Sequence, residues 1–263
     1  MMVHFSLIGQ TQVMSFNIRY DNPDDGENWW EFRKSEVVTL LNHYQPDFFG
    51  LQEALPHQSD FIASKLQDYN HIGHGRDGIG TNSEGVPLFF NKDKYQLLKS
   101  ELFWLSETPD KPSIGWDASL NRIVVYGGFK NKESGETIHV FNCHFDHLGA
   151  KAREKSAELL MKYLNQHQLL NEQIIVMGDL NCLPMDKPIK ILSQHLKDCF
   201  TENIDGSYGP IGTFNAFDTQ KVLTKRIDYI FVRNIMVSSY RAVDDKRKNN
   251  LYPSDHLPVR IKF

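Results

Sequence analysis

The feature that most restricts the fold of this chain is a series of short apolar runs that each stop at a polar residue. In residues 173–184, QIIVMGDLNCLP, an apolar run of strand length ends at Gly178 and is followed at once by Asp179 and Asn181. Runs of about four to eight β-branched and aromatic residues, bounded by turn-forming residues, are typical of buried strands. The sequence therefore predicts strands over residues 12–18, 47–53, 86–91, 122–130, 138–145, 173–180, 226–232 and 257–263.

Segments with helical spacing separate several of these strands. Apolar residues recur at i, i+3, i+4 and i+7 over residues 30–45 and again over 150–165. A third helix is predicted over residues 56–69, where Pro56 suits the first turn. Helices and strands alternate in the first half, and strands then follow one another directly, which indicates mixed sheets. Two sheets packed face to face with helices outside satisfy both patterns.

The chain is long enough for one large domain. It has 263 residues, no internal repeat and no long linker, so we predict a single domain over residues 13–263. Residues 1–12, MMVHFSLIGQTQ, are interpreted as an N-terminal extension or the remnant of an export signal, because a short apolar piece precedes small and polar residues. The compartment stays open between the cytoplasm and export. No apolar run reaches the roughly 18 residues that a membrane span requires.

Charge and cysteine content exclude several classes. The net charge of -4 argues against a surface that binds long nucleic acids through charge alone. The basic run at residues 246–248 follows two aspartates and is interpreted as a solvated loop. The 3 cysteines fit no metal-finger spacing, and an odd number argues against a disulfide framework.

Residues 73–78, GHGRDG, match the glycine pattern of dinucleotide sites, but turn-forming residues follow instead of a helix, so we interpret them as a loop.

Carboxylate, carboxamide and imidazole side chains fall at the ends of the predicted strands. They are Asn17, Glu53, His144, Asp179, Asn181, Asp228, Asp255 and His256. Carboxylates brought together would repel one another unless a cation neutralised them, so their convergence would imply a metal ion. Oxygen donors without cysteine favour Mg²⁺ or Mn²⁺ over Zn²⁺. A hard cation beside an aspartate and a histidine is suited to phosphoryl transfer, because the metal neutralises the phosphate while a carboxylate orients or deprotonates water.

At these residues the chain resembles the endonuclease/exonuclease/phosphatase superfamily of metal-dependent phosphoesterases. The resemblance runs from residues 15–20 (SFNIRY) through 50–53 (GLQE) and 178–181 (GDLN) to 226–232 (RIDYIFV) and 254–259 (SDHLPV). It implies an α/β fold, a four-layer sandwich of two mixed β-sheets packed face to face with helices outside. This agrees with the strands and helices predicted independently above. The resemblance also implies hydrolysis of a P–O bond by in-line attack of an activated water.

The resemblance further implies roles for individual residues. Glu53 would be the principal ligand of Mg²⁺ or Mn²⁺, with Asn17 and Asp255 completing or supporting the metal site. The choice between one and two metal ions stays open. Asp179 would position and activate the attacking water, and Asn181 would hold a non-bridging phosphate oxygen.

Three further residues complete the implied catalytic set. His256, oriented by Asp228, would contact the phosphoryl group, either stabilising its charge or sharing proton transfer. His144 matches the histidine that in many members of the superfamily donates to the phosphate or to the leaving oxygen. Asp179 and Asn181 are two residues apart, so on an extended chain period-two alternation would direct both side chains at one phosphate.

Residues 142–160, NCHFDHLGAKAREKSAELL, resemble more narrowly a bacterial subgroup whose substrates are largely unassigned. On that basis Asp146, His147, Arg76 and Arg122 are candidates for binding the substrate end of the pocket. Each has a plain structural alternative. Asp146 and His147 would also suit the cap of the helix predicted to begin near Ala150, and each arginine would also suit a surface position or an ion pair.

The leading hypothesis is therefore a divalent-metal-dependent phosphodiesterase or phosphatase. The acidic net charge and the scarcity of basic clusters favour a phosphorylated small molecule or a short phosphodiester as substrate. One alternative is a nuclease that acts on DNA or RNA through a local basic groove, whose activity salt would weaken steeply. The other is a non-catalytic module that binds a phosphate-bearing ligand on the same fold.

Overall fold

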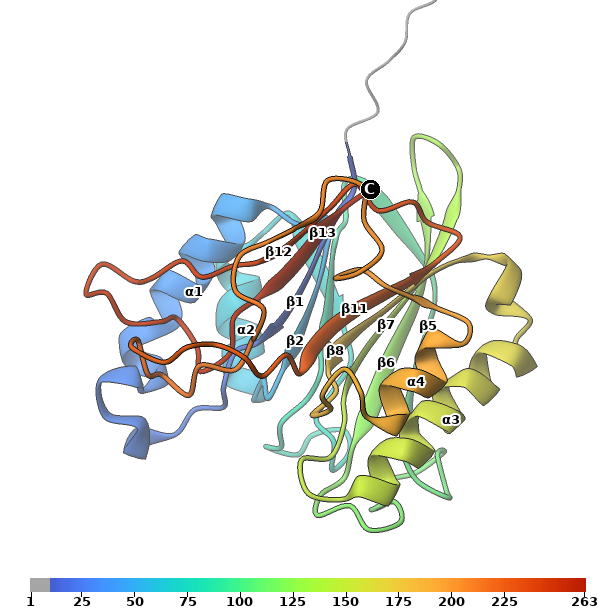
Figure 1. The fold of residues 1–263 in the computed structure, drawn as a ribbon, viewed down its shortest axis with the longest axis horizontal. Helices are drawn as coiled ribbons and strands as arrows, with labels where there is room; N and C mark the ends of the chain where they lie inside the picture. Colours follow the sequence, from blue (N-terminus) through green and yellow to red (C-terminus); the bar gives the residue numbers. More distant parts are fainter. Residues whose placement is uncertain (1–9) are drawn as a thin grey trace, which may run out of the picture.

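A computed structural model describes residues 10–263, so residues 1–9 of the predicted N-terminal extension lie outside the described residues. Two β-sheets form the centre of the molecule (Figure 1). The seven-stranded sheet has the order β10 (Ser207–Tyr208), β12 (Ser239–Ala242), β13 (Val259–Lys262), β1 (Gln12–Asn17), β2 (Phe48–Gln52), β4 (Leu88–Asn91) and β3 (Tyr69–Ile72). The six-stranded sheet has the order β5 (Tyr95–Trp104), β6 (Ile123–Asn131), β7 (Thr137–His144), β8 (Gln173–Asp179), β11 (Asp228–Arg233) and β9 (Lys197–Asp198).

Helices cover the outer face of each sheet (Figure 1). They are the α-helices α1 (Trp30–Tyr44), α2 (Pro56–Lys65), α3 (Ala150–Gln166) and α4 (Lys187–Ser193), and the 3-10 helices η1 (Pro23–Asn28) and η2 (Leu169–Asn171). The helices α1 and α2 lie against the seven-stranded sheet, and α3 and α4 lie against the six-stranded sheet. Within residues 10–263, none of these helices is long and apolar enough to cross a membrane.

The alternation of side chains along the strands divides the apolar residues into layers. In β8, Ile175 and Met177 belong to the core between the two sheets, whereas Ile174 and Val176 pack on the opposite face against α3 and α4. Phe16 of β1 likewise faces the layer beneath α1 and α2. The result is helix, sheet, sheet, helix, which confirms the predicted four-layer sandwich.

The eight predicted strands and three predicted helices are all present, and Pro56 stands in the first turn of α2 as expected. Sequence reasoning missed α4, the strands β3, β5, β9, β10 and β12, and both 3-10 helices, and the helix predicted over residues 56–69 ends at Lys65 because Tyr69 begins β3. The helix α4 has only 7 residues, too few for a clear helical period. The strand β5 is an edge strand of 10 residues whose pairing with β6 shifts register between Leu97 and Lys99, so its side chains do not alternate regularly.

Candidate active site

The seven-stranded sheet brings its polar residues to one end of the sandwich. The strands β1 and β2 are parallel and pair with Asn17 opposite Gln52, so Glu53, the next residue, lies beside Asn17. The backbone of Glu53 is left-handed, with φ 59°, which is unfavourable for a residue with a side chain and turns the chain out of the sheet. Asp255 and His256 precede β13, which is antiparallel to β1 and therefore begins at the same end.

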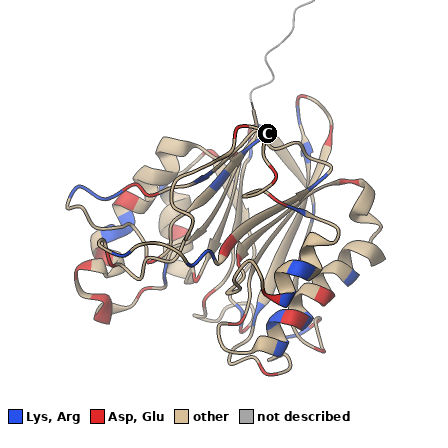
Figure 2. Ribbon diagram, in the orientation of Figure 1, with Lys and Arg blue, Asp and Glu red and all other residues tan. Residues whose placement is uncertain are grey.

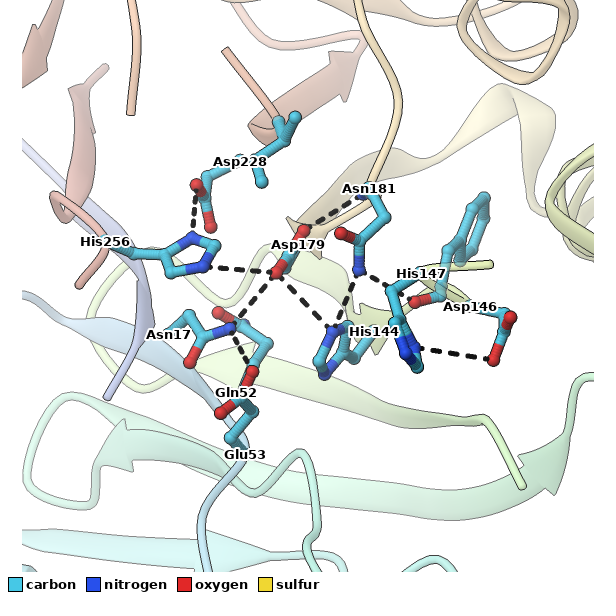
Figure 3. Close-up of polar contacts among 12 residues, drawn as sticks. Asn17, Gln52, Glu53, His144, Asp146, His147, Asp179, Asn181, Asp228 and His256 are labelled. Carbon is cyan, nitrogen blue, oxygen red and sulfur yellow. Dashed lines mark hydrogen bonds and ion pairs between the residues drawn. The ribbon is translucent and has the colours of Figure 1, made fainter. Parts of the chain in front are cut away.

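The six-stranded sheet also brings polar residues to this end of the sandwich. The strands β7 and β8 are parallel, and their last residues, His144 and Asp179, stand opposite each other. The strand β11 is antiparallel to β8, so its first residue, Asp228, also lies opposite Asp179. Because the two sheets stack with these ends together, residues at the ends of β1, β2, β7, β8, β11 and β13 meet around Asp179 (Figure 3).

Asp179 lies at the centre of this cluster and is only 1% exposed. The Asn17 carboxamide Nδ2 donates to Asp179 Oδ2 and to Glu53 Oε1, at 3.1 Å in both cases. The His144 Nε2 atom lies 3.4 Å from Asp179 Oδ2, and the His256 Nε2 atom lies 3.8 Å from it (Figure 3). Burial, and next the negative charge of Asp228, raise the pKa of Asp179 to about 7. A carboxylate of that basicity is able to accept a proton near neutral pH.

His256 is held between two carboxylates. Its Nδ1 atom lies 2.9 Å from Asp228 Oδ2, while its Nε2 atom faces Asp179. Burial alone would lower the pKa of His256, but the charges of Asp228 and Asp179 outweigh burial and hold the pKa well above its usual range. The side chain is therefore a buried imidazolium that is oriented by Asp228.

Asn181 reaches the cluster by a route that differs from the sequence expectation. The strand ends at Asp179, and Asn181 has a left-handed backbone with φ 48°, so the extended, period-two argument for this pair is wrong. The Asn181 backbone N–H instead donates to Asp179 Oδ1 at 2.9 Å, closing a turn. This turn places Asn181 Nδ2 3.1 Å from His144 Nε2, and both residues line the same cavity as Asp179.

Burial also shifts the pKa values of His144 and Asp255. Burial, followed by the positive charge of Arg122, lowers the pKa of His144 well below its usual range, so the imidazole is neutral. Burial raises the pKa of Asp255, and Glu53 adds to the effect. The Arg19 guanidinium lies 4.0 Å from the Asp255 carboxylate, and its positive charge offsets part of this rise in the pKa of Asp255.

The donor set at this end of the sandwich fits a hard divalent cation. The carboxylates of Glu53 and Asp255 line one cavity, and burial raises the pKa of Asp255, a shift that a bound cation would reverse. Polar atoms of Asp179, Asp228 and His256 also lie within 4.8 Å of one another, but the His256 imidazolium has no lone pair to give a metal. Among the described residues, Asp228 Oδ1 is buried without a hydrogen-bond partner. Oxygen ligands without a thiolate suit Mg²⁺ or Mn²⁺.

The cavity has a volume of about 610 Å³, in the range of small-molecule sites. Of the predicted site residues, it is lined by Glu53, Arg76, Arg122, His144, His147, Asp179, Asn181, Asp255 and His256. Asn17 and Asp228 stand behind this surface and hold the lining carboxylates and His256.

Sequence reasoning missed several lining residues. They are Arg19, Tyr20, Glu84, Leu120, Leu183, Phe214, Lys225 and Ile227. Arg19 and Tyr20 belong to the SFNIRY motif and Lys225 and Ile227 flank the start of RIDYIFV, so proximity to these motifs would have identified them. Figure 2 shows Lys and Arg interspersed with Asp and Glu on α3 and on the loops.

Asp146 has a different position from the one expected of a substrate ligand. It is 1% exposed and does not line the cavity. Its Oδ1 accepts the backbone N–H groups of Leu148 and Gly149, at 3.0 and 2.7 Å, and its Oδ2 lies 3.3 Å from Arg122 Nε. Asp146 therefore holds Arg122, and Arg122 and His147 face the cavity.

The cap of α3 also differs from the sequence alternative. Asp117, from the loop after β5, accepts the backbone N–H groups of Lys151 and Ala152 at 3.2 and 2.6 Å. The first turn of the helix is thus capped by a residue distant in sequence, and Asp146 only closes the turn before it.

The profile of the Endonuclease/Exonuclease/phosphatase family matches residues 14–256. A solved endonuclease/exonuclease/phosphatase family protein from Bacteroides thetaiotaomicron is 34% identical and superposes with a TM-score of 0.91, covering 97% of this chain and 97% of that chain. A mannosyl-6-phosphatase from the same organism is 35% identical with a TM-score of 0.90, covering 95% of this chain and 98% of that chain. Mouse nocturnin is 24% identical over 263 residues, which cover 89% of this chain and 58% of that protein.

Proposed function

The chain belongs to the endonuclease/exonuclease/phosphatase family, and on that premise we propose that it is a divalent-metal-dependent phosphoester hydrolase. The observation that carries the proposal is the meeting of Glu53, Asp179, Asp255 and two histidines in one cavity at a shared end of both sheets. The mannosyl-6-phosphatase relative supports a phosphorylated small molecule as the substrate. Among such molecules it favours a phosphorylated sugar.

In this proposal Glu53 would hold Mg²⁺ or Mn²⁺, with Asp255 and Asn17 completing or supporting the site. The cation would neutralise charge on the phosphoryl group. Asn17 donates to Glu53 and Asp179 and keeps their carboxylates at a constant separation. The Tyr20 backbone N–H donates to the other Glu53 oxygen at 3.2 Å and fixes the rotamer of that side chain.

The chain's own residues supply the chemistry of the step. Asp179 accepts a proton from the attacking water as the water oxygen bonds to phosphorus and the bond from phosphorus to the leaving oxygen breaks. The His256 imidazolium stabilises negative charge on the phosphoryl oxygens. With the phosphate bound, Asn181 Nδ2 would exchange its hydrogen bond to His144 Nε2 for one to a non-bridging oxygen, which frees the neutral His144 to donate to the phosphate or to the leaving oxygen.

The test compares p-nitrophenyl phosphate with bis(p-nitrophenyl) phosphate in Mg²⁺, in Mn²⁺ and with a chelator. We expect turnover that the chelator abolishes and that falls by about 10²-fold or more in Glu53→Gln and in Asp179→Asn. Preference for the monoester would support a phosphatase, and preference for the diester would support the nuclease alternative. Metal-independent binding of phosphate without any turnover would instead support the non-catalytic module.

A further inference from the structure

Two ion pairs lie at the end of the cavity that is away from Asp228 and His256. Arg76 donates from both terminal nitrogens to the two oxygens of Glu84, at 2.9 and 3.0 Å. Arg122 is paired with Asp146 and is 5% exposed. Arg76, Glu84 and Arg122 also line a smaller cavity together with Glu53 and His144, which joins this end to the metal-binding residues. We refer to Arg76, Glu84, Arg122 and Asp146 as the double ion pair.

The double ion pair leaves hydrogen-bonding groups directed at the cavity. Arg122 uses Nε for Asp146 and Nη2 for His147 Nδ1, at 3.3 and 2.9 Å, and its Nη1 makes no hydrogen bond among the described residues. A guanidinium nitrogen can only donate, so His147 Nδ1 accepts and the ring proton is on Nε2. Figure 3 places His147 beyond His144 on the side away from His256. The cavity therefore offers fixed donors from Arg122 and His147 beside the carboxylate acceptor of Glu84.

The charges of this end cancel, because each arginine has its own carboxylate. A second phosphate or a nucleic-acid backbone would require unpaired cations there, and recruiting either arginine would strip a partly or fully buried carboxylate of its partner. Lys225, a lining cation without a carboxylate at ion-pair distance among the described residues, lies instead on the segment that leads to Asp228.

Aromatic surface is also scarce in the cavity. The aromatic lining residues are Tyr20 and Phe214 within the described part of the chain, and Phe214 already packs edge-on against His256 with 5.1 Å between ring centroids. Arg19 covers the ring of Tyr20 at 4.5 Å. A nucleobase would therefore find little free ring surface on which to stack.

We propose that Arg76, Glu84 and Arg122 of the double ion pair, with His147, recognise the hydroxyl groups of a neutral sugar that carries a single phosphate, and that they discriminate against substrates with a second phosphate. Neighbouring donors and acceptors in fixed positions match the paired hydroxyls of a hexose, whose hydrogen bonds need both kinds of partner. The inference rests on the proposed phosphoester hydrolysis, because it concerns the leaving-group end of the same cavity.

The experiment measures kcat/KM for mannose 6-phosphate, fructose 1,6-bisphosphate and p-nitrophenyl phosphate. The variants are Arg122→Lys, which keeps the charge beside Asp146 but loses the guanidinium donors, and Glu84→Gln, which leaves Arg76 without its counter-charge. Arg247→Lys is the matched control, because Arg247 is 4% exposed and does not line this cavity.

The ratio of kcat/KM for mannose 6-phosphate to that for p-nitrophenyl phosphate should fall about tenfold or more in Arg122→Lys and should not change in Arg247→Lys. Glu84→Gln should raise the ratio of bisphosphate to monophosphate, because the site gains net positive charge. The inference would be overturned if Arg122→Lys left the first ratio unchanged and Glu84→Gln left the second unchanged, or if the wild type preferred the bisphosphate. None of these results would contradict the proposed phosphoester hydrolysis.

Absence of turnover with all three esters would instead count against the proposed function. Isothermal titration of mannose 6-phosphate into Asp179→Asn with Mg²⁺ then decides the inference separately. Binding that Arg122→Lys weakens about tenfold in that background would support it, and no binding, or binding that Arg122→Lys leaves unchanged, would overturn it.

Discussion

Replacing Asp146 with asparagine removes one charge from a buried ion pair at nearly constant side-chain volume, and we expect it to destabilise the fold by about 3 kcal/mol at pH 7. The asparagine Oδ1 is able to keep the hydrogen bonds from Leu148 and Gly149. Its amide nitrogen, however, would stand against the Nε–H of Arg122, so that a donor faces a donor. The Arg122 guanidinium would then be buried without its counter-charge.

The magnitude follows from what remains around Arg122. Removing one partner of a buried pair commonly costs about 3–5 kcal/mol. The negative charge of Glu84 and the hydrogen bond to His147 persist in the variant and compensate part of the loss. The cost should therefore lie at the lower end of that range.

The cost should also depend on pH. Burial alone would raise the pKa of Asp146, but hydrogen bonds from Gly149 and Leu148, together with Ser119 and Arg122, hold it well below its usual range. Between that low pKa and the unfolded value of about 3.9, the unfolded chain binds a proton that the folded chain does not. The stabilisation by Asp146 is therefore present above about pH 4 and is lost as the pH falls further, by up to about 1.4 kcal/mol per pH unit.

Urea unfolding of wild type and Asp146→Asn, followed by tryptophan fluorescence at pH 7, 5 and 3, measures this difference. We expect about 3 kcal/mol at pH 7 and 5, and about 1 kcal/mol less at pH 3. The double variant Asp146→Asn/Arg122→Met should be more stable than Asp146→Asn alone, because it removes the unpaired charge. A cost below about 1 kcal/mol, or one that is the same at all three pH values, would refute the reasoning.

Four further predictions concern the rest of the molecule. Arg33→Met should cost about 3 kcal/mol in urea unfolding and weaken Mn²⁺ binding measured by calorimetry, because this buried guanidinium donates to backbone carbonyls that include Pro253 O, two residues before Asp255. Gly178→Ala should cost about 3 kcal/mol or more by the same assay, because its φ is 149° and an added Cβ would lie 1.9 Å from the Cys143 carbonyl oxygen. His256→Gln should lower kcat about 10²-fold or more with a small change in KM, and an unchanged kcat would remove this residue from the mechanism. Mg²⁺ or Mn²⁺ added after a chelator should raise the melting temperature of the wild type but not of Glu53→Gln, since a bound ligand stabilises only a fold that retains its site.

Much of the candidate site was predictable because its residues stand at strand ends. Strand positions are readable from local apolar runs, and parallel pairing brings the ends of neighbouring strands to one edge. The approach of Glu53 to Asn17, and of His144 to Asp179, follows from that rule, whereas the stacking of the two sheets brings these two pairs together. The residues that hold the cluster were not predictable in the same way, since Arg33 reaches Pro253 across 220 positions of the sequence.

The sequence by itself determined the eight strands that carry or adjoin the site, the three longer helices, the four-layer architecture and the set of polar residues delivered to one end. These depend on local periodicity and on short motifs, which act over a few residues. Details that depend on backbone turns or on contacts between distant parts of the chain were decided only by the tertiary structure. Asn181 joins Asp179 through a left-handed turn rather than by extension, and Asp117 rather than Asp146 caps α3. Asp146 lies outside the lining of the cavity and pairs with Arg122, because a buried arginine needs a carboxylate at a distance that only the packed chain can set.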